Sequence, residues 1–191
     1  MARSRPERGF TFVEMMVAGG ILVSLSALAT LWLAGVSELW SASTTQGDVR
    51  LRAQETMNRV VDELRSATLA AGGSPPNASI PAAPDNTSVT FYLPADLDLN
   101  GLIIDANGNT EWGTLNPVQY AYVAAQRQLV RIAGGQQQVV AHDVSGATFK
   151  NRAIDGTLNA NEIQITLTLQ RTTMKGRALS ATATEIVKLR N

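Results

Sequence analysis

The sequence predicts an α+β protein in which one long amino-terminal helix precedes a β-rich block. Three observations predict this class. A long apolar stretch begins near residue 10, apolar residues recur at helical spacing between residues 38 and 71, and residues 72–191 combine strand patterns with turn residues. We expect the strands to form an antiparallel sheet with one face on the apolar stripe of the helix. The chain therefore divides into segments 1–9, 10–37, 38–71 and 72–191.

Residues 10–37 are predicted to cross a membrane. Glu14 is the only charged residue between residues 9 and 37. A helix needs roughly 20 apolar residues to cross the hydrocarbon core of a bilayer, and this segment is long enough. Basic residues before the segment place the amino terminus in the cytoplasm and the rest of the chain outside; they are Arg3, Arg5 and Arg8.

The segment opens on the motif Gly9-Phe10-Thr11-Phe12-Val13-Glu14, directly after a short basic leader. This motif resembles the class III signal of type IV prepilins and of type II secretion pseudopilins. The resemblance implies that a prepilin peptidase cuts after Gly9 and methylates Phe10, the new amino-terminal residue. It also implies the type IV pilin fold, in which a long spine helix packs its second half on the antiparallel β-sheet of a globular head.

Glu14 needs a cationic partner, because a carboxylate held at mid-membrane costs about 2.5 to 3.5 kcal/mol. The implied cleavage creates a charged amine at Phe10, four residues before Glu14. The two groups can pair within one chain. Alternatively, Glu14 of an incoming subunit can pair with the Phe10 amine of its neighbour and set the register of assembly. A third interpretation is that Glu14 only extends to the membrane interface.

A secretory signal is the alternative of another class. Ala27-Leu28-Ala29 is a small-x-small cleavage site, and cleavage there would release a soluble binding protein that starts at Thr30. Against this alternative, the apolar stretch continues to Val36, and Glu14 interrupts the region where a signal has an unbroken apolar core.

The segment after the membrane is predicted to be an amphipathic helix. Apolar residues three or four positions apart form its stripe, namely Val49, Ala53, Met57, Val60, Leu64, Ala67 and Ala71. Charged residues are expected on the opposite, solvent-facing side, namely Arg50, Arg52, Glu55, Arg59, Asp62, Glu63 and Arg65. We expect ion pairs of Asp48 with Arg52 and of Glu55 with Arg59. Glycines and prolines within residues 72–76 predict that the helix ends after Ala71.

Residues 72–191 contain the strand signals. We predict strands over residues 89–93, 118–124, 128–132, 137–142, 163–169 and 179–189. The second and third of these form a hairpin that turns at Gln126 and Arg127. Glu185 falls on an inward-facing position of the last strand. We predict a bulge there, with a local ion pair or a subunit contact as alternatives.

The order of these strands resembles PilW-type minor pilins and the J-type minor pseudopilin of type II secretion. Leu31 stands where many major pilins have a proline, and the cysteine pair of many major pilins is missing. The resemblance therefore implies a minor pilin that primes assembly or lies near the pilus tip, with a minor pseudopilin as the alternative. It implies other minor and major pilins, a prepilin peptidase and an inner-membrane assembly platform as partners.

The same resemblance implies a location. The chain is expected in the inner membrane, with its amino terminus in the cytoplasm and its head in the periplasm, and it contacts the lipid bilayer before assembly. After assembly it is expected in the pilus at the cell surface.

Residues 96–101 match the first half of a calcium loop, with oxygen ligands at positions 1, 3 and 5 and glycine at position 6. The carboxylate usual at position 12 is missing, because Asn107 stands there. The candidate ligands are Asp96, Asp98, Asn100, the Leu102 carbonyl, Asp105 and Glu111. A solvated turn of the same composition is the alternative, since Asp, Asn and Gly are also the usual residues of turns.

The composition excludes several other classes of function. The 191 residues carry 16 basic and 16 acidic side chains, no cysteine and one histidine, His142. Without cysteine there are no disulfides, zinc fingers or thiol catalysis, and the balanced charge gives no reason to expect a nucleic acid partner. The sequence contains no phosphate loop, nucleophile elbow or dinucleotide fingerprint. We therefore expect no enzymatic activity.

Overall fold

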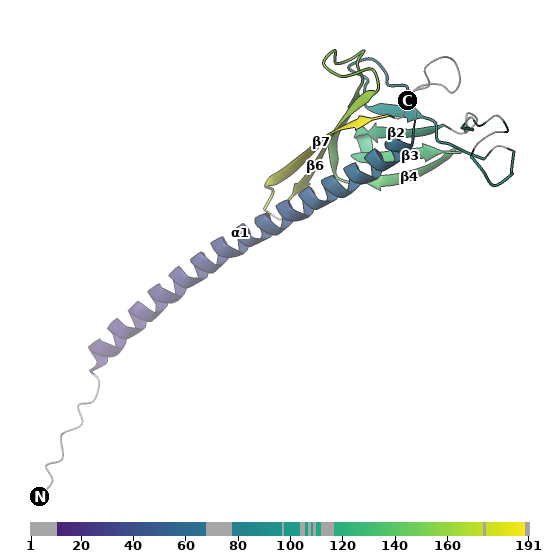
Figure 1. The fold of residues 1–191 in the computed structure, drawn as a ribbon. Helices are drawn as coiled ribbons and strands as arrows, with labels where there is room; N and C mark the ends of the chain where they lie inside the picture. Colours follow the sequence, from purple (N-terminus) through teal and green to yellow (C-terminus); the bar gives the residue numbers. More distant parts are fainter. Residues whose placement is uncertain are drawn as a thin grey trace, which may run out of the picture. The chain divides into compact units, whose positions relative to one another are not determined.

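The computed structural model describes residues 11–67, 78–96, 98–103, 106, 108, 110–111, 117–173 and 175–189. The chain forms two compact units, Met1–Ser43 and Thr44–Asn191. Helix α1, Phe12–Ser66, begins in the first unit and ends in the second, and strands β1 to β7 follow in the second unit (Figure 1). The predicted α+β class, with one long amino-terminal helix and antiparallel strands, is confirmed.

In the first unit, α1 exposes its apolar residues on all sides. Every described residue from 11 to 37 is exposed, and the side chains of Phe12 and Trp32 are 77% and 69% exposed. Among the described residues, α1 is the one helix long and apolar enough to cross a membrane. An apolar surface of this extent favours lipid or other protein chains over water as its surroundings.

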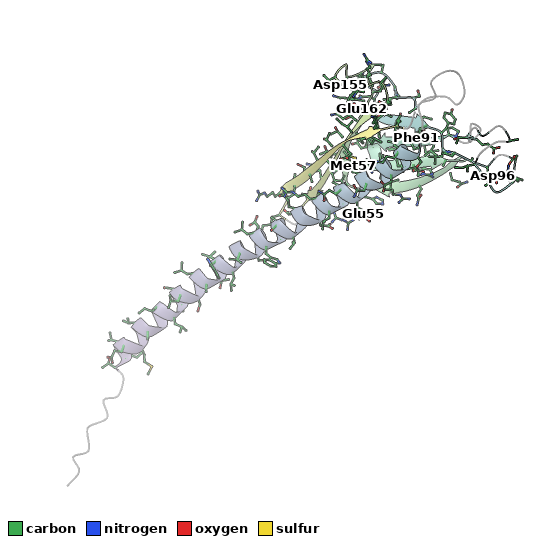
Figure 2. All side chains as sticks on the ribbon, viewed as in Figure 1. Glu55, Met57, Phe91, Asp96, Asp155 and Glu162 are labelled. Atoms are coloured by element: carbon green, nitrogen blue, oxygen red, sulfur yellow. The ribbon has the colours of Figure 1, made fainter. Side chains whose placement is uncertain are left out.

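In the second unit, α1 buries one stripe and exposes the other side. The predicted stripe is confirmed as far as Ala67, and Figure 2 shows Met57 on the side of the strands and Glu55 on the other side. Thr56 and Val61 widen the buried face. The helix ends at Ser66, where the Ala67 amide donates to the Leu64 carbonyl at 3.0 Å. The helix was expected to continue to Ala71, but Ala67 is already outside it, and residues 68–71 lie outside the described residues.

The first sheet has four antiparallel strands in the order β1-β2-β3-β4. Their bounds are β1 Ser88–Phe91, β2 Val118–Val123, β3 Gln128–Ala133 and β4 Gln136–Ala141. The predicted hairpin is confirmed: a single 3₁₀ turn, Ala124–Gln126, joins β2 to β3. Arg127 closes this turn in the left-handed conformation, at φ 53°.

The second sheet has three antiparallel strands in the order β5-β6-β7. They are β5 Val144–Lys150, β6 Glu162–Thr172 and β7 Ala178–Lys188. Strand β6 alternates buried and half-buried residues along most of its length, as its period-two pattern predicts. Strand β5 was not predicted, because Gly146 and its small neighbours give a weak strand signal and the register shifts beside that glycine.

The division into two sheets differs from the single sheet expected from the sequence. The chain turns sharply between β4 and β5, where Asp143 has φ 61°, and β5 then pairs with β6 instead of β4. The buried Asn86 joins the sheets, since its carbonyl accepts from the Phe149 amide at 2.8 Å and its side chain donates to the Phe149 carbonyl at 3.0 Å. Local pattern predicts hairpins between consecutive strands, but it does not show where the chain leaves one sheet and begins another.

The predicted bulge at Glu185 is wrong. Strand β7 pairs with β6 in one continuous register, with Glu185 opposite Ile165. A bulge is unnecessary because β7 is the outer strand of its sheet and leaves the Glu185 side chain exposed beside α1. The Glu185 side chain therefore points into a groove beside α1 and not into the core.

The core lies between the stripe of α1 and the two sheets. Its largest fully buried side chains include Phe91 and Tyr120, whose rings stack with centroids 6.1 Å apart, and Phe149 from the second sheet. Apolar residues from α1 and from both sheets form one cluster, so burial of the stripe depends on both sheets.

Candidate functional site

Thr11 and Glu14 form a capping box at the start of α1. Glu14 Oε2 accepts hydrogen bonds from the Thr11 amide and from Thr11 Oγ1, each at 2.9 Å, and Thr11 Oγ1 accepts from the Glu14 amide at 3.3 Å. Glu14 was predicted to matter for its charge alone, and the capping box was not predicted, although Thr11-x-x-Glu14 is its signature. The carboxylate is therefore held at the amino end of the helix, where the helix dipole favours negative charge. Gly9 and Phe10 lie outside the described residues.

Glu63 attaches α1 to the first sheet through Arg131 and Tyr120. Arg131 Nε lies 3.0 and 2.9 Å from the two carboxylate oxygens of Glu63, and the Tyr120 hydroxyl donates to Oε2 of the same carboxylate. The side chains of Glu63 and Arg131 are only 20% and 24% exposed. The placement of Glu63 on the solvent side is therefore wrong: its partners on β2 and β3 are 57 and 68 residues away in the sequence.

The ionisation of this cluster follows from its contacts. Burial opposes a charge on Glu63, but the hydrogen bonds from Arg131 and Tyr120 outweigh it and lower the pKa of the carboxyl group. Burial, together with the adjacent Glu63 carboxylate, raises the pKa of Tyr120 far above its usual value. The cluster is satisfied within the fold, so it serves to hold the helix in place.

A second ion-pair network ties α1 to the second sheet. Arg171 on β6 contacts Asp48 through Nη1 at 2.7 Å and Asp143 through Nε at 2.8 Å. Asp48 also accepts from Arg52 at 3.0 Å, which confirms one of the two predicted pairs on the helix. The other predicted pair is wrong, since Arg59 instead donates to Gln138 of β4 at 3.3 Å.

The loop after β1 brings three of the predicted ligands together. Carboxylate oxygens of Asp96, Asp98 and Glu111 lie within 4.8 Å of one another (Figure 2 shows Asp96). Glu111 reaches this place because its carbonyl accepts from the Ala95 amide at 3.0 Å. Asp105 lies outside the described residues.

The same carboxylates also organise the loop itself. Asp96 accepts from the backbone amides of Asn100 and Gly101 at 3.2 and 2.8 Å, and Asp98 accepts from the Asn100 amide at 3.1 Å. The side chain of Asn100 donates to Asp98 and accepts from the Leu102 amide, each at 2.7 Å. These bonds are those of an Asx turn, so the calcium and solvated-turn interpretations both fit the geometry.

The comparisons with known proteins add no family assignment. No protein-family model, no curated protein and no solved structure matches this chain.

Proposed function

We propose that this chain is a minor type IV pilin that primes pilus assembly and is incorporated at or near the pilus tip. The observation that carries the proposal is the motif of residues 9–14 at the start of α1, followed by a helical segment that exposes apolar side chains on all sides. A membrane anchor alone needs neither the glycine and phenylalanine before the helix nor the carboxylate in its first turn.

Glu14 supplies the assembly chemistry of the proposal. Cleavage after Gly9 creates a charged amine at Phe10, and the capping box holds the Glu14 carboxylate at the amino end of α1. In the membrane this carboxylate pairs with the amine of its own chain. In a filament of parallel helices it pairs with the amine of a neighbour, because a charge among apolar helices is stable only when it has a partner.

The second unit supports the same proposal. A pilin head buries one stripe of its helix under antiparallel strands, and the stripe from Val49 to Ala67 is buried in this way. The head is then periplasmic, because the basic residues of the leader precede the apolar segment.

Analysis of the mature amino terminus tests the proposal. We expect the full chain, produced with a prepilin peptidase, to begin at Phe10 and to carry one methyl group there. The Gly9→Val variant should keep residues 1–9. A chain that starts at Thr30 would instead indicate export through a cleaved secretory signal, and an unprocessed chain would indicate a plain anchor; either result contradicts the proposal.

A second measurement separates the pilin from a minor pseudopilin, which shares the cleavage signal. We expect the chain in pili sheared from the cell surface, at a low ratio to the major subunit. Recovery only with components of a type II secretion system would contradict the assignment to a pilus and leave the processing chemistry intact.

A further inference from the structure

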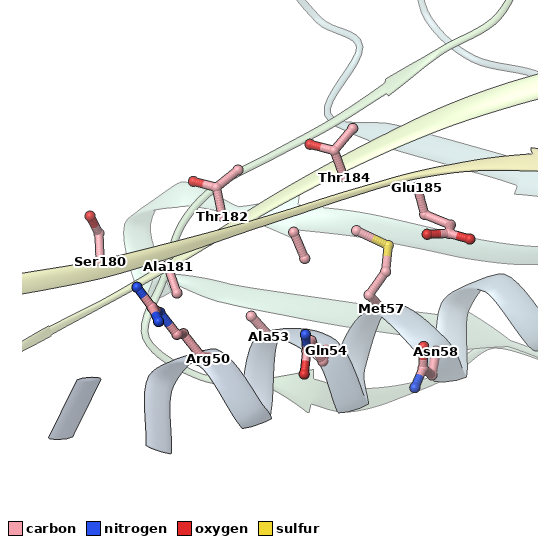
Figure 3. A pocket seen from close by; sticks show the side chains of 11 residues that line it. Arg50, Ala53, Gln54, Met57, Asn58, Ser180, Ala181, Thr182, Thr184 and Glu185 are labelled. Carbon is pink, nitrogen blue, oxygen red and sulfur yellow. The ribbon is translucent and has the colours of Figure 1, made fainter. Parts of the chain in front are cut away.

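Each sheet has an open edge beside α1. Strand β7 is the outer strand of the three-stranded sheet, and β4 is the outer strand of the four-stranded sheet. A groove of about 630 Å³ lies between α1 and β7, lined by Arg50, Met57 and Glu185 among others (Figure 3). A groove of about 570 Å³ lies between α1 and the end of β4, and different residues of the helix line it. The two edges therefore flank α1 on different sides (Figure 1).

Among the residues that the structure describes, the edge of β7 has little of the usual protection against pairing with another chain. Soluble proteins protect outer strands with prolines, bulges, lysines or a covering segment. Strand β7 has eleven residues in one continuous register and no proline, and its two charged residues, Glu185 and Lys188, lie at its end. A long, regular and mostly uncharged edge is a template for an added strand.

The directions of the two strands relative to α1 are opposite. Figure 3 shows Ala181 beside Arg50 and Glu185 beside Met57 and Asn58, so β7 runs in the direction of the helix. In β4, Gln138 bonds to Arg59, whereas His142 after the strand shares a groove with Asp48. Strand β4 therefore runs against the helix. If two copies have parallel helices, β7 of one and β4 of the other meet as antiparallel strands, the more stable arrangement.

Charge complementarity indicates how these edges meet. Within the described part of the chain, Glu185 has no basic partner at ion-pair distance. Arg59 has no acidic partner at that distance either, although it lies near Glu63, and it donates to Gln138 at 3.3 Å. Both Glu185 and Gln138 face α1 in their own sheets. An antiparallel pairing with Glu185 opposite Gln138 brings the Glu185 carboxylate next to Arg59 of the other copy.

We propose that β7 of one copy of this chain adds to β4 of a second copy, with residues 184–187 opposite residues 136–139. Strand β4 is regular over these four residues, because the shift in its register with β3 comes only after Val139. The proposal rests on the proposed function, since insertion in one membrane makes the helices parallel. The contact joins two different surfaces, so it places two copies side by side and leaves one of these edges free on each copy.

Cysteine cross-linking tests this contact, because the chain has no cysteine of its own. Thr184→Cys and Val139→Cys are introduced into separate full-length chains, which are produced together in membranes and oxidised. We expect a reducible dimer at a yield at least about fivefold above that of either chain alone. A Thr184→Cys chain paired with a Gln138→Cys chain is the matched control and should give little dimer, because these side chains lie on opposite faces of the joined sheet.

Charge reversal tests the register. Glu185→Arg in the Thr184→Cys chain should lower the dimer yield about three- to fivefold, as expected for one cross-strand charge pair. Arg59→Glu in the Val139→Cys chain should restore it, whereas Arg152→Glu, an exposed residue in the loop after β5, should not.

Three results would overturn the proposal: no excess dimer in the mixture, dimers of the Thr184→Cys chain alone at equal yield, or no response to charge reversal. Each of these refutes the contact while leaving a Phe10 amino terminus, and with it the proposed function, unaffected. Conversely, a mature terminus other than Phe10 refutes the proposed function whatever the cross-links show.

Discussion

Glu63 attaches α1 to two strands of the first sheet. Its carboxylate accepts from a guanidinium and a phenol at once, in a place where water is largely excluded. Removing one member of such a cluster costs more than the cluster itself contributes, because the remaining groups keep their burial and lose their partner.

We expect Glu63→Gln to lower the free energy of unfolding by about 2 kcal/mol, since Arg131 then remains half-buried without a carboxylate. The measurement is urea unfolding of the full chain in detergent. Glu55→Gln, an exposed carboxylate on the same helix, is the control and should change stability little. Equal stability of the two variants would show that the cluster does not hold the helix.

The pKa shifts of the same cluster predict the dependence of stability on pH. The lowered pKa of Glu63 adds stability above the ordinary glutamate pKa, about 4.3, and this stability is lost as the pH falls through the folded value. The raised pKa of Tyr120 adds stability that is complete below about pH 10 and is lost above it. We expect melting temperatures to show that Tyr120→Phe removes most of the alkaline loss and keeps the acid loss. An unchanged alkaline loss would contradict the assigned hydrogen bond.

At the scale of elements, α1 combines two environments in one continuous helix. The part of α1 in the first unit exposes apolar side chains. The part in the second unit buries one stripe under two sheets. Helices in proteins are stabilised mainly by such packing, so the stripe decides the stability of the second unit.

The matched residues Leu64 and Leu51 test this element. Leu64 is 0% exposed and Leu51 is 68% exposed on the same helix. We expect Leu64→Ala to destabilise the second unit by about 3 kcal/mol, because it removes buried methyl groups and leaves a cavity. Leu51→Ala should change the unfolding free energy by less than about 0.5 kcal/mol. Chemical unfolding monitored by far-ultraviolet circular dichroism measures the unfolding free energy of both variants.

The two interpretations of the loop that contains Asp96, a calcium site and a solvated turn, predict different responses to calcium. If calcium binds, added calcium raises the melting temperature of the full chain more than magnesium does, and Glu111→Gln removes the increment. This variant leaves the turn bonds of Asp96 and Asp98 in place, so loss of the turn does not explain the result. A solvated turn predicts no calcium-dependent change in either chain.

For the molecule as a whole, the proposed function makes assembly depend on Glu14. We expect Glu14→Gln to insert in the membrane and to be cleaved normally, but to be incorporated into pili at least about tenfold less, because the amide cannot neutralise the Phe10 amine. Quantitative blotting of sheared pili measures this, with Glu55→Gln as the control. Undiminished incorporation of Glu14→Gln would contradict the role of the carboxylate in assembly.

Most of the helix and several strands were predictable because their signals are local. The spacing from Val49 to Ala67 and the alternation of β6 reflect the geometry of one element against a core, and both are confirmed. The candidate sites were predictable only in part. Asp96 and Asp98 stand out by their spacing, but the meeting of Glu111 with them depends on a backbone bond to Ala95.

The periodicity of neighbouring residues was enough to predict an α+β chain with an apolar amino-terminal helix, a buried stripe and alternating strands. Only the tertiary structure decided that the strands form two sheets, that Glu63 bonds to Arg131 and Tyr120, and that β4 and β7 are left as edges on different sides of α1. These features join residues far apart in the chain, and the free energy of such contacts depends on the whole packing arrangement.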